Sequence, residues 1–165
     1  MVNFDAAGDR VFDILIVDDL VENIRFLSDF LTARNYQVRK AINGKTALMA
    51  IQAFPPDLIL LDINMPDLNG YEVCRQLKAN PKTQSIPIIF LSAADAEEDK
   101  LKALQVGGAD YITKPFQLEE VLVRVRSQLM IQQLRDRLST CREALAQTQK
   151  ALQTAQEHLA ALQSE

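Results

Sequence analysis

Short apolar runs that end in carboxylates constrain the fold of this chain more than any other feature. Residues 57–61 are predicted to form a fully buried strand, and Asp62 follows them directly. A second run, residues 12–17, leads into Asp18 and Asp19. A carboxylate is not expected to stay ionised inside such a strand. Each acid is therefore predicted to lie at the carboxyl end of its strand, where an α/β sheet has its ligand crevice.

Strand and helix patterns alternate from residue 12 to about residue 130. The expected strands are residues 12–17, 37–41, 57–61, 86–91 and 110–113. The expected helices are residues 21–34, 44–54, 71–79 and 96–106, followed by one that begins near Leu118. Five units of this kind predict a doubly wound α/β fold, in which helices cover both faces of a five-stranded parallel sheet.

The pattern changes after residue 130. Apolar residues now recur in alternating steps of three and four, and neither glycine nor proline follows Pro115. This heptad pattern predicts that the fifth helix continues as a long coiled-coil helix over residues 131–165. The predicted seam consists of Ile131, Leu134, Leu138, Cys141, Leu145, Leu152, Leu159 and Leu162.

We expect this helix to form a homodimer. In a parallel pair, Arg137 would face Arg142 of the second helix, which is a like-charge contact. Ala144, Ala151 and Ala155 permit close approach of two helices. An antiparallel pair and a higher assembly therefore remain alternatives.

Composition limits the remaining classes of function. The chain has 165 residues and a net charge of −4, so no surface for direct binding of nucleic acid is expected. No apolar run approaches the roughly 20 residues that span a bilayer, and the N-terminus lacks the features of a secretory signal. Cys74 and Cys141 are expected to be reduced thiols, which favours a cytoplasmic protein. Residues 1–11 are expected to be a flexible leader, residues 12–130 one compact domain and residues 131–165 an appended helix.

Four of the five expected strands end at polar residues with complementary chemistry. These residues are Asp18 and Asp19, Asp62, Ser92 and Lys114. Parallel strands bring them to one edge of the sheet, where three carboxylates repel one another unless a divalent cation and the lysine compensate them. Phosphoryl transfer needs mainly the positioning and neutralisation of the transferred oxygens. The set therefore suits a metal-assisted reaction at a nucleophilic aspartate.

The same residues strongly resemble the receiver domain of bacterial two-component response regulators. The matching motifs are Asp18-Asp19, Asp62 with Met65-Pro66 and Gly70, Ser92-Ala93, and Tyr111 three residues before Lys114-Pro115. Their order and spacing fit over residues 12–130. The resemblance implies the flavodoxin-like receiver fold and a role in signal transduction by phosphorelay.

The resemblance also implies a role for each residue of the site. Asp62 would accept a phosphoryl group from the phosphohistidine of a sensor histidine kinase or from a phosphotransfer protein. Asp19 and Asp62 would bind Mg²⁺, or Mn²⁺ in its place, directly. Asp18 would bind the ion through water, and Asn64 through its backbone carbonyl.

Phosphorylation would act through further residues that the resemblance assigns. Lys114 would pair with the phosphoryl oxygens, Ser92 would turn to bond the phosphoryl group, and Tyr111 would rotate inward. The Lys114–Pro115 bond would be a cis peptide, a form that is rare without proline. The signalling surface would consist of the fourth helix, the fifth strand and the fifth helix. The protein would catalyse only its own phosphorylation and dephosphorylation.

Two alternatives to a phosphorylation switch remain. One is a constitutive scaffold, in which the coiled coil dimerises and phosphorylation has no effect. The other is a metal-dependent phosphohydrolase, although such enzymes usually carry a second acid two residues after the nucleophile, where this chain has Asn64. No output domain is recognisable, so the chain is expected to be a fragment or a receiver with a connector. Serine stands at position 92, where threonine is commoner in the family.

Overall fold

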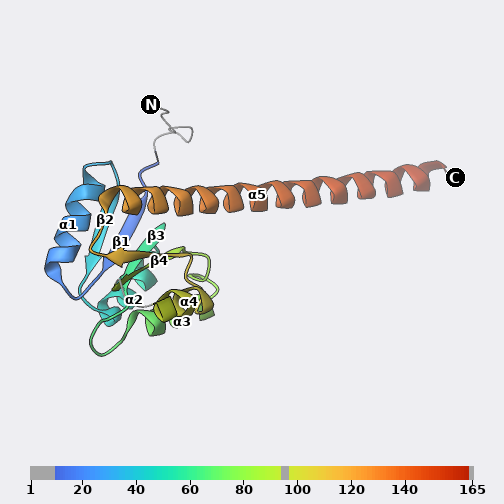
Figure 1. Cartoon of the computed structure of the whole chain (residues 1–165). Coiled ribbons are helices and arrows are strands. Elements are labelled where there is room, and N and C mark those ends of the chain that lie inside the picture. Colours follow the sequence, from blue (N-terminus) through green and yellow to red (C-terminus); the bar gives the residue numbers. More distant parts are fainter. Residues whose placement is uncertain (1–9, 94–96, 164–165) are drawn as a thin grey trace. The chain divides into compact units, whose positions relative to one another are not determined.

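The computed structural model describes residues 10–93 and 97–163 (Figure 1). Most of the expected leader at residues 1–11 lies outside these residues. The chain divides into two compact units, Met1–Leu129 and Met130–Glu165. The first unit holds the sheet and its helices, and the second is entirely helical in its described part.

The sheet confirms the expected fold class. Five parallel strands form it in the order β2-β1-β3-β4-β5. They are β1 (Asp13–Val17), β2 (Gln37–Ala41), β3 (Leu58–Asp62), β4 (Ile88–Ala93) and β5 (Asp110–Lys114). Every residue of the central strand β3 is buried, as its continuous apolar run predicts. The short and more polar β2 lies at one edge of the sheet.

Helices cover both faces of the sheet (Figure 1). They are α1 (Val21–Thr32), α2 (Gly44–Ala53), α3 (Gly70–Ala79), α4 (Glu97–Gln105) and α5 (Leu118–Gln163). One core joins α1 and the first turns of α5 to side chains such as Ile14 and Ile16. The other core joins α2, α3 and α4 to Leu15 and Val17. Alternate residues of β1 therefore serve opposite faces, which is the period-two rule of a strand.

Several element boundaries differ by one or two residues from the sequence-based expectation, and the largest shifts are those of α1 and β4. Helix α1 ends at Thr32 rather than at residue 34, because Asn35 adopts a left-handed conformation with φ 63° and reverses the chain. Strand β4 begins at Ile88 and extends to Ala93. Ser92 is therefore a buried residue of β4, one residue before the end of the strand.

Helix α5 is longer than any other element, with 46 residues. It contains no proline or glycine, so nothing in its sequence stops the helix where its apolar pattern shifts near residue 130. None of the helices among the described residues is long and apolar enough to cross a membrane.

Candidate functional site

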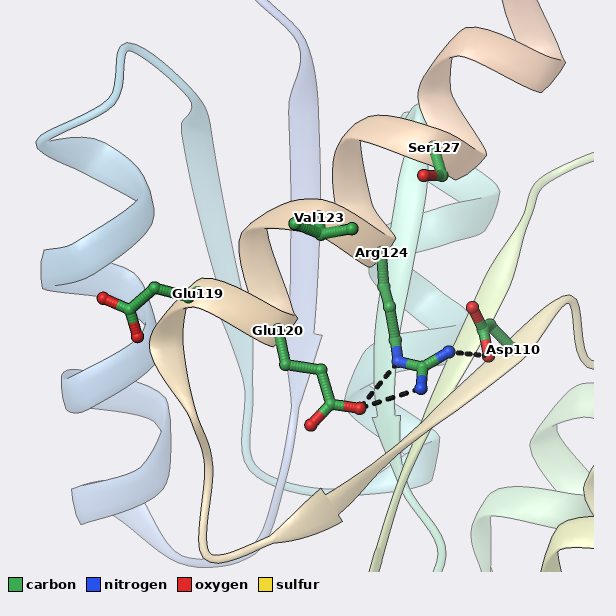
Figure 2. Close-up of a pocket in the computed structure, with 6 residues that line it drawn as sticks. All are labelled: Asp110, Glu119, Glu120, Val123, Arg124 and Ser127. Atoms are coloured by element: carbon green, nitrogen blue, oxygen red, sulfur yellow. Dashed lines mark hydrogen bonds and ion pairs between the residues drawn. The ribbon is translucent and has the colours of Figure 1, made fainter.

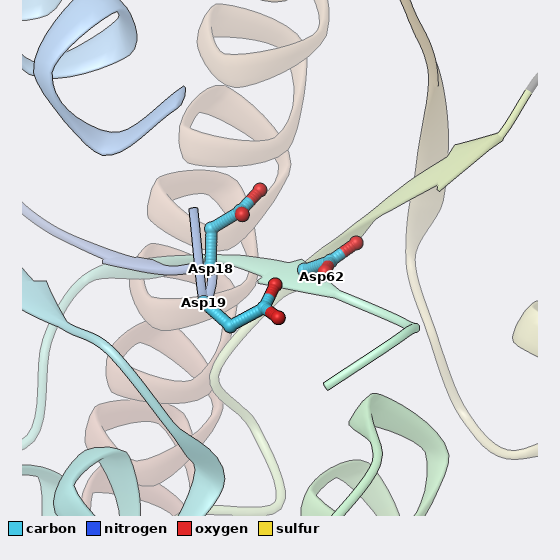
Figure 3. A group of neighbouring side chains, drawn as sticks. All are labelled: Asp18, Asp19 and Asp62. Carbon is cyan, nitrogen blue, oxygen red and sulfur yellow. The ribbon is translucent and has the colours of Figure 1, made fainter. Parts of the chain in front are cut away.

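Three carboxylates meet at the carboxyl edge of the sheet. Strands β1 and β3 are parallel neighbours with Val17 opposite Leu61, so the next residues, Asp18 and Asp62, emerge side by side. Oxygen atoms of Asp18, Asp19 and Asp62 all lie within 4.8 Å of one another (Figure 3). Asp18 and Asp62 are buried, whereas Asp19 is exposed. The two apolar runs thus place the acids together as predicted.

Lys114 compensates part of this charge from the far end of β5. Its Nζ donates to Asp18 Oδ2 at 2.8 Å and to Asp62 Oδ1 at 3.0 Å. Burial alone would lower the pKa of Lys114, but the hydrogen bonds and negative charges of Asp18 and Asp62 raise it above its usual value. The lysine is therefore a fixed cation that bridges two of the three acids.

Asp62 is left in an unfavourable environment for a negative charge. Burial raises the pKa of Asp62 from 3.8 to about 6, although the hydrogen bond and positive charge of Lys114 oppose this. The negative charges of Asp18 and Asp19 raise the pKa further. One lysine does not balance three acids, so the cluster favours an added cation.

Asp18 is held more firmly than the other two acids. Its Oδ1 accepts from the backbone N–H of Leu20 at 2.9 Å. The side-chain nitrogen of Asn23 donates to both of its oxygens, at 3.2 and 3.0 Å. These bonds and Lys114 occupy much of the acceptor capacity of Asp18. Asn23 was missed by the sequence-based reasoning, although its position in the first turn of α1 after an aspartate pair is a usable signal.

The loop after β3 is fixed at its far end by glycine and a capping box. A Cβ added to Gly70 would lie 2.3 Å from the carbonyl oxygen of Asp62. Asn69 Oδ1 accepts from the backbone N–H of Glu72, and a Glu72 carboxylate oxygen accepts from the backbone N–H of Asn69. Helix α3 therefore begins directly against Asp62, and the exposed Asn64 lies within the loop that this contact closes.

Ser92 supplies a polar group without a partner. It is 1% exposed, and its Oγ makes no hydrogen bond among the residues that the structure describes. Leu91, the residue before it, lies opposite Asp62 in the register of β3 and β4. Burying a hydroxyl without a partner costs free energy, and this hydroxyl remains able to donate a hydrogen bond.

Tyr111 and its neighbours form the β5–α5 side of the first unit. Tyr111 is half-buried, and the guanidinium carbon of Arg124 lies 5.5 Å from its ring centroid. Arg124 also pairs with Asp110 at 2.7 Å and with Glu120 at 2.8 Å (Figure 2). The hollow beside them is lined by Asp110, Glu119, Glu120, Val123, Arg124 and Ser127. Arg124 thus links β5 to α5 next to the predicted switch tyrosine.

The remaining predicted site residues lie in two places. The Lys114–Pro115 peptide bond is cis. The predicted seam residues all lie on the described part of the second unit, and their side chains are exposed.

Comparison with known proteins identifies this arrangement. The sequence pattern of the response regulator receiver domain matches residues 14–126. The chain belongs to that family. Receiver domains serve in phosphorelay signalling, and aspartate phosphorylation with Mg²⁺ dependence is general among them. The donor set fits such an ion, because hard cations take oxygen ligands and the three acids offer them.

Two curated relatives are similar over the receiver domain. Response regulator PleD of Caulobacter vibrioides is 42% identical over 128 residues, which cover 75% of this chain and 28% of PleD. Response regulator ArlR of Staphylococcus saprophyticus is 42% identical over 116 residues, which cover 70% of this chain and 51% of ArlR. The chain therefore spans about a quarter to a half of the length of these relatives.

Solved structures show the same receiver domain fold. Chemotaxis protein CheY4 of Vibrio cholerae superposes with a TM-score of 0.68 at 28% identity, covering 72% of this chain and 98% of CheY4. NtrX of Brucella abortus superposes with a TM-score of 0.74 at 26% identity, covering 79% of this chain and 29% of NtrX.

Proposed function

We propose that Asp62 is the phosphoacceptor of this receiver domain. A carboxylate oxygen of Asp62 attacks the phosphorus atom of a phosphohistidine on a sensor histidine kinase or phosphotransfer protein. The phosphorus–nitrogen bond breaks, and the histidine leaves with its electron pair and takes up a proton. The chemistry of the domain is limited to this transfer and to hydrolysis of its own acyl phosphate.

The unpartnered Ser92 hydroxyl is the observation that carries this proposal. A phosphoryl group on Asp62 brings three strong acceptor oxygens into a site that has a buried donor without an acceptor. Lys114 already lies 3.0 Å from Asp62 and supplies the positive charge that those oxygens require. A phosphorylated Asp62 thus offers an acceptor to the one buried side-chain polar atom that lacks a hydrogen-bond partner among the described residues.

Residues of the acidic cluster are proposed to hold Mg²⁺, with Mn²⁺ as a substitute. Asp19, Asp62 and the backbone carbonyl of Asn64 are the direct ligands. Asp18 acts through water, in keeping with the hydrogen bonds that already occupy its carboxylate. When bound, the ion neutralises the transferred phosphoryl oxygens.

Phosphorylation is proposed to act on the surface of α4, β5 and α5. Ser92 turns toward the phosphoryl group and Tyr111 rotates inward, which changes the surroundings of Arg124. The switch then reaches the C-terminal helix, which forms a homodimer through its seam and connects residues 12–130 to an output. We place this activity in the cytoplasm, where a kinase would meet the domain.

Intact mass after incubation with Mg²⁺ and acetyl phosphate tests the phosphoacceptor. Wild type is expected to gain one phosphoryl group, roughly 80 Da, while Asp62→Asn gains none. Asp57→Asn is a matched control, because this acid pairs with Arg10 and lies outside the acidic cluster. An adduct that persists in Asp62→Asn would overturn the assignment. No adduct and no binding of beryllofluoride by wild type would favour the constitutive scaffold.

A further inference from the structure

The described part of the second unit presents an exposed apolar stripe along its helix. Seven large aliphatic side chains of the predicted seam are between 40% and 74% exposed. They are Ile131, Leu134, Leu138, Leu145, Leu152, Leu159 and Leu162. A stripe repeating at heptad spacing over this length is typical of a helix that packs on another helix. The order of large and small residues along the stripe indicates which partner helix fits it.

A parallel pair of identical helices would pack poorly on this stripe. Taking Ile131 as position a, the a positions are isoleucine once and then leucine four times, whereas the central d positions are Cys141, Thr148 and Ala155. Parallel dimers favour the opposite arrangement, with β-branched residues at a and leucine at d. In a parallel pair each of these small residues would also face the same residue of the partner helix. Three successive d layers would then be too small to fill the space between the helices.

An antiparallel pair corrects this mismatch layer by layer. A twofold axis between Ala146 and Gln147 places each a residue of one helix opposite a d residue of the other. The resulting layers are Ile131 with Leu162, Leu134 with Leu159, Leu138 with Ala155, Cys141 with Leu152, and Leu145 with Thr148. Every small residue then faces a leucine, and the two end layers pair large with large. Two copies of the stripe are therefore complementary to each other when the helices run antiparallel.

Charges that flank the stripe favour the same orientation. In a parallel pair Arg137 faces Arg142 of the partner helix, and this like-charge contact occurs twice by symmetry. In the antiparallel pair Arg137 lies beside His158 of the second copy, so it meets no arginine there. Arg135 and Arg142 then lie beside glutamines of the second copy, so no two arginines meet.

We propose that residues 131–162 pair with a second copy of this chain in antiparallel orientation, centred between Ala146 and Gln147. The proposal rests on the homodimer proposed above and is independent of Asp62 phosphorylation. Met130, at the start of the second unit, then lies beside the C-terminal end of the partner helix.

Disulfide trapping in the full chain tests the orientation. Wild type carries its exposed thiol at Cys141, and the variant Cys141→Ser with Leu152→Cys carries it at position 152 instead. Cys74 is buried in the receiver core and is common to both. Each protein is oxidised alone with copper–phenanthroline, and then the two are mixed and oxidised.

The antiparallel pair predicts a covalent dimer only in the mixture, with peptides linked between positions 141 and 152. The parallel pair predicts the reverse: each protein crosslinks to itself, since position 141 meets position 141 and position 152 meets position 152. Crosslinks within the separate proteins, or a monomeric mass in sedimentation, would overturn the proposal. A monomer that still gains the phosphoryl adduct would remove the dimer alone and leave the phosphoacceptor assignment standing.

A charge reversal supplies a second, independent measurement that does not alter the seam. Arg137→Glu turns the parallel Arg137–Arg142 contact into an attraction at two symmetric places, so a parallel dimer would tighten several-fold at low salt. In the antiparallel dimer the same change meets His158 and no arginine, and the dimer dissociation constant is expected to change less than about twofold. Tightening beyond that range in sedimentation equilibrium would contradict the antiparallel orientation.

Discussion

Asp62 is a charged side chain in a place that disfavours charge. It closes a strand whose five residues are all buried, and its pKa is raised to about 6 mainly by that burial. The folded protein therefore binds the Asp62 proton more tightly than the unfolded chain does. Its free energy of unfolding falls as pH rises from 3.8 to about 6, and the penalty is complete above that range.

The first prediction follows from this penalty. Asp62→Asn is expected to raise the free energy of unfolding at pH 7.5 without metal by on the order of 1–3 kcal/mol, because no buried charge remains. The gain should shrink as pH is lowered to 4.5, where the folded wild type is protonated at this position. Thermal denaturation of both proteins in EDTA at the two pH values measures this gain. A gain that is the same at both pH values would contradict the explanation by a buried charge on Asp62.

Ser92 gives the second prediction at this scale. Ser92→Ala is expected to leave the metal-free protein as stable as wild type or more so, since the lost hydroxyl has no partner. Beryllofluoride affinity should fall roughly ten- to a hundredfold, the value of a hydrogen bond to a charged group. Titration followed by tyrosine fluorescence gives both affinities. Ser92→Thr keeps the hydroxyl and should bind as wild type does; equal binding by the alanine variant would exclude this role.

At the scale of elements, α3 can approach β3 closely because residue 70 is a glycine and has no side chain. Gly70→Ala would drive a Cβ to 2.3 Å from the Asp62 backbone oxygen, so the loop or the helix must shift. We predict a loss of roughly 2–4 kcal/mol in the free energy of unfolding together with slower phosphorylation. Urea denaturation and adduct formation over time measure the two effects.

Gly44 provides the control for this substitution. An added Cβ there would meet the Val73 side chain at 2.7 Å, which can rotate away, and its nearest backbone atom, the carbonyl oxygen of Leu68, would lie at 3.0 Å rather than 2.3 Å. Gly44→Ala should therefore cost less than Gly70→Ala and leave the phosphorylation rate near that of wild type. Equal losses of stability and of phosphorylation rate in the two variants would show that the close contact between Gly70 and Asp62 has no special effect.

Elements differ in how well the sequence predicts them. Strands β1 and β3 could be predicted because continuous apolar runs show burial on both faces, and this alone brought Asp18 beside Asp62. The extension of β4 beyond Ser92 could not, because Ala93 joins the strand through its parallel register with Lys114 of β5, which local residue types do not reveal. The same holds for Asn23, whose bonds to Asp18 depend on how α1 leaves the sheet.

At the scale of the whole molecule, charge balance links metal binding to stability. Three acids face one lysine, so saturating Mg²⁺ at about 100 times its dissociation constant should stabilise the fold by about 2.7 kcal/mol. Asp19→Asn is expected to lose this stabilisation, whereas Asp67→Asn, an exposed acid of the loop between β3 and α3 that lies outside the cluster, should keep it. Melting temperatures with and without Mg²⁺ measure the difference. Full stabilisation of Asp19→Asn would remove this residue from the ligand set.

The division into two units gives a prediction about truncation. We expect a chain that ends at Leu129 to unfold cooperatively and to accept a phosphoryl group, because it keeps the buried Val121, Val125 and Leu129 of α5. Ending the chain at Arg124 removes two of these side chains and should lower the melting temperature markedly. Calorimetry and intact mass compare the two chains. Loss of the adduct in the longer one would refute an independent receiver.

The uninterrupted helix α5 also restricts how the gene can change in length. Each residue added to an α-helix turns everything beyond it by about 100°, whereas seven residues bring it back to within about 20°. A single-codon insertion after Met130 would carry the later leucines to another face of the helix, while a seven-codon insertion would keep them in line. In descendants of this gene, this segment should therefore lengthen and shorten by whole heptads.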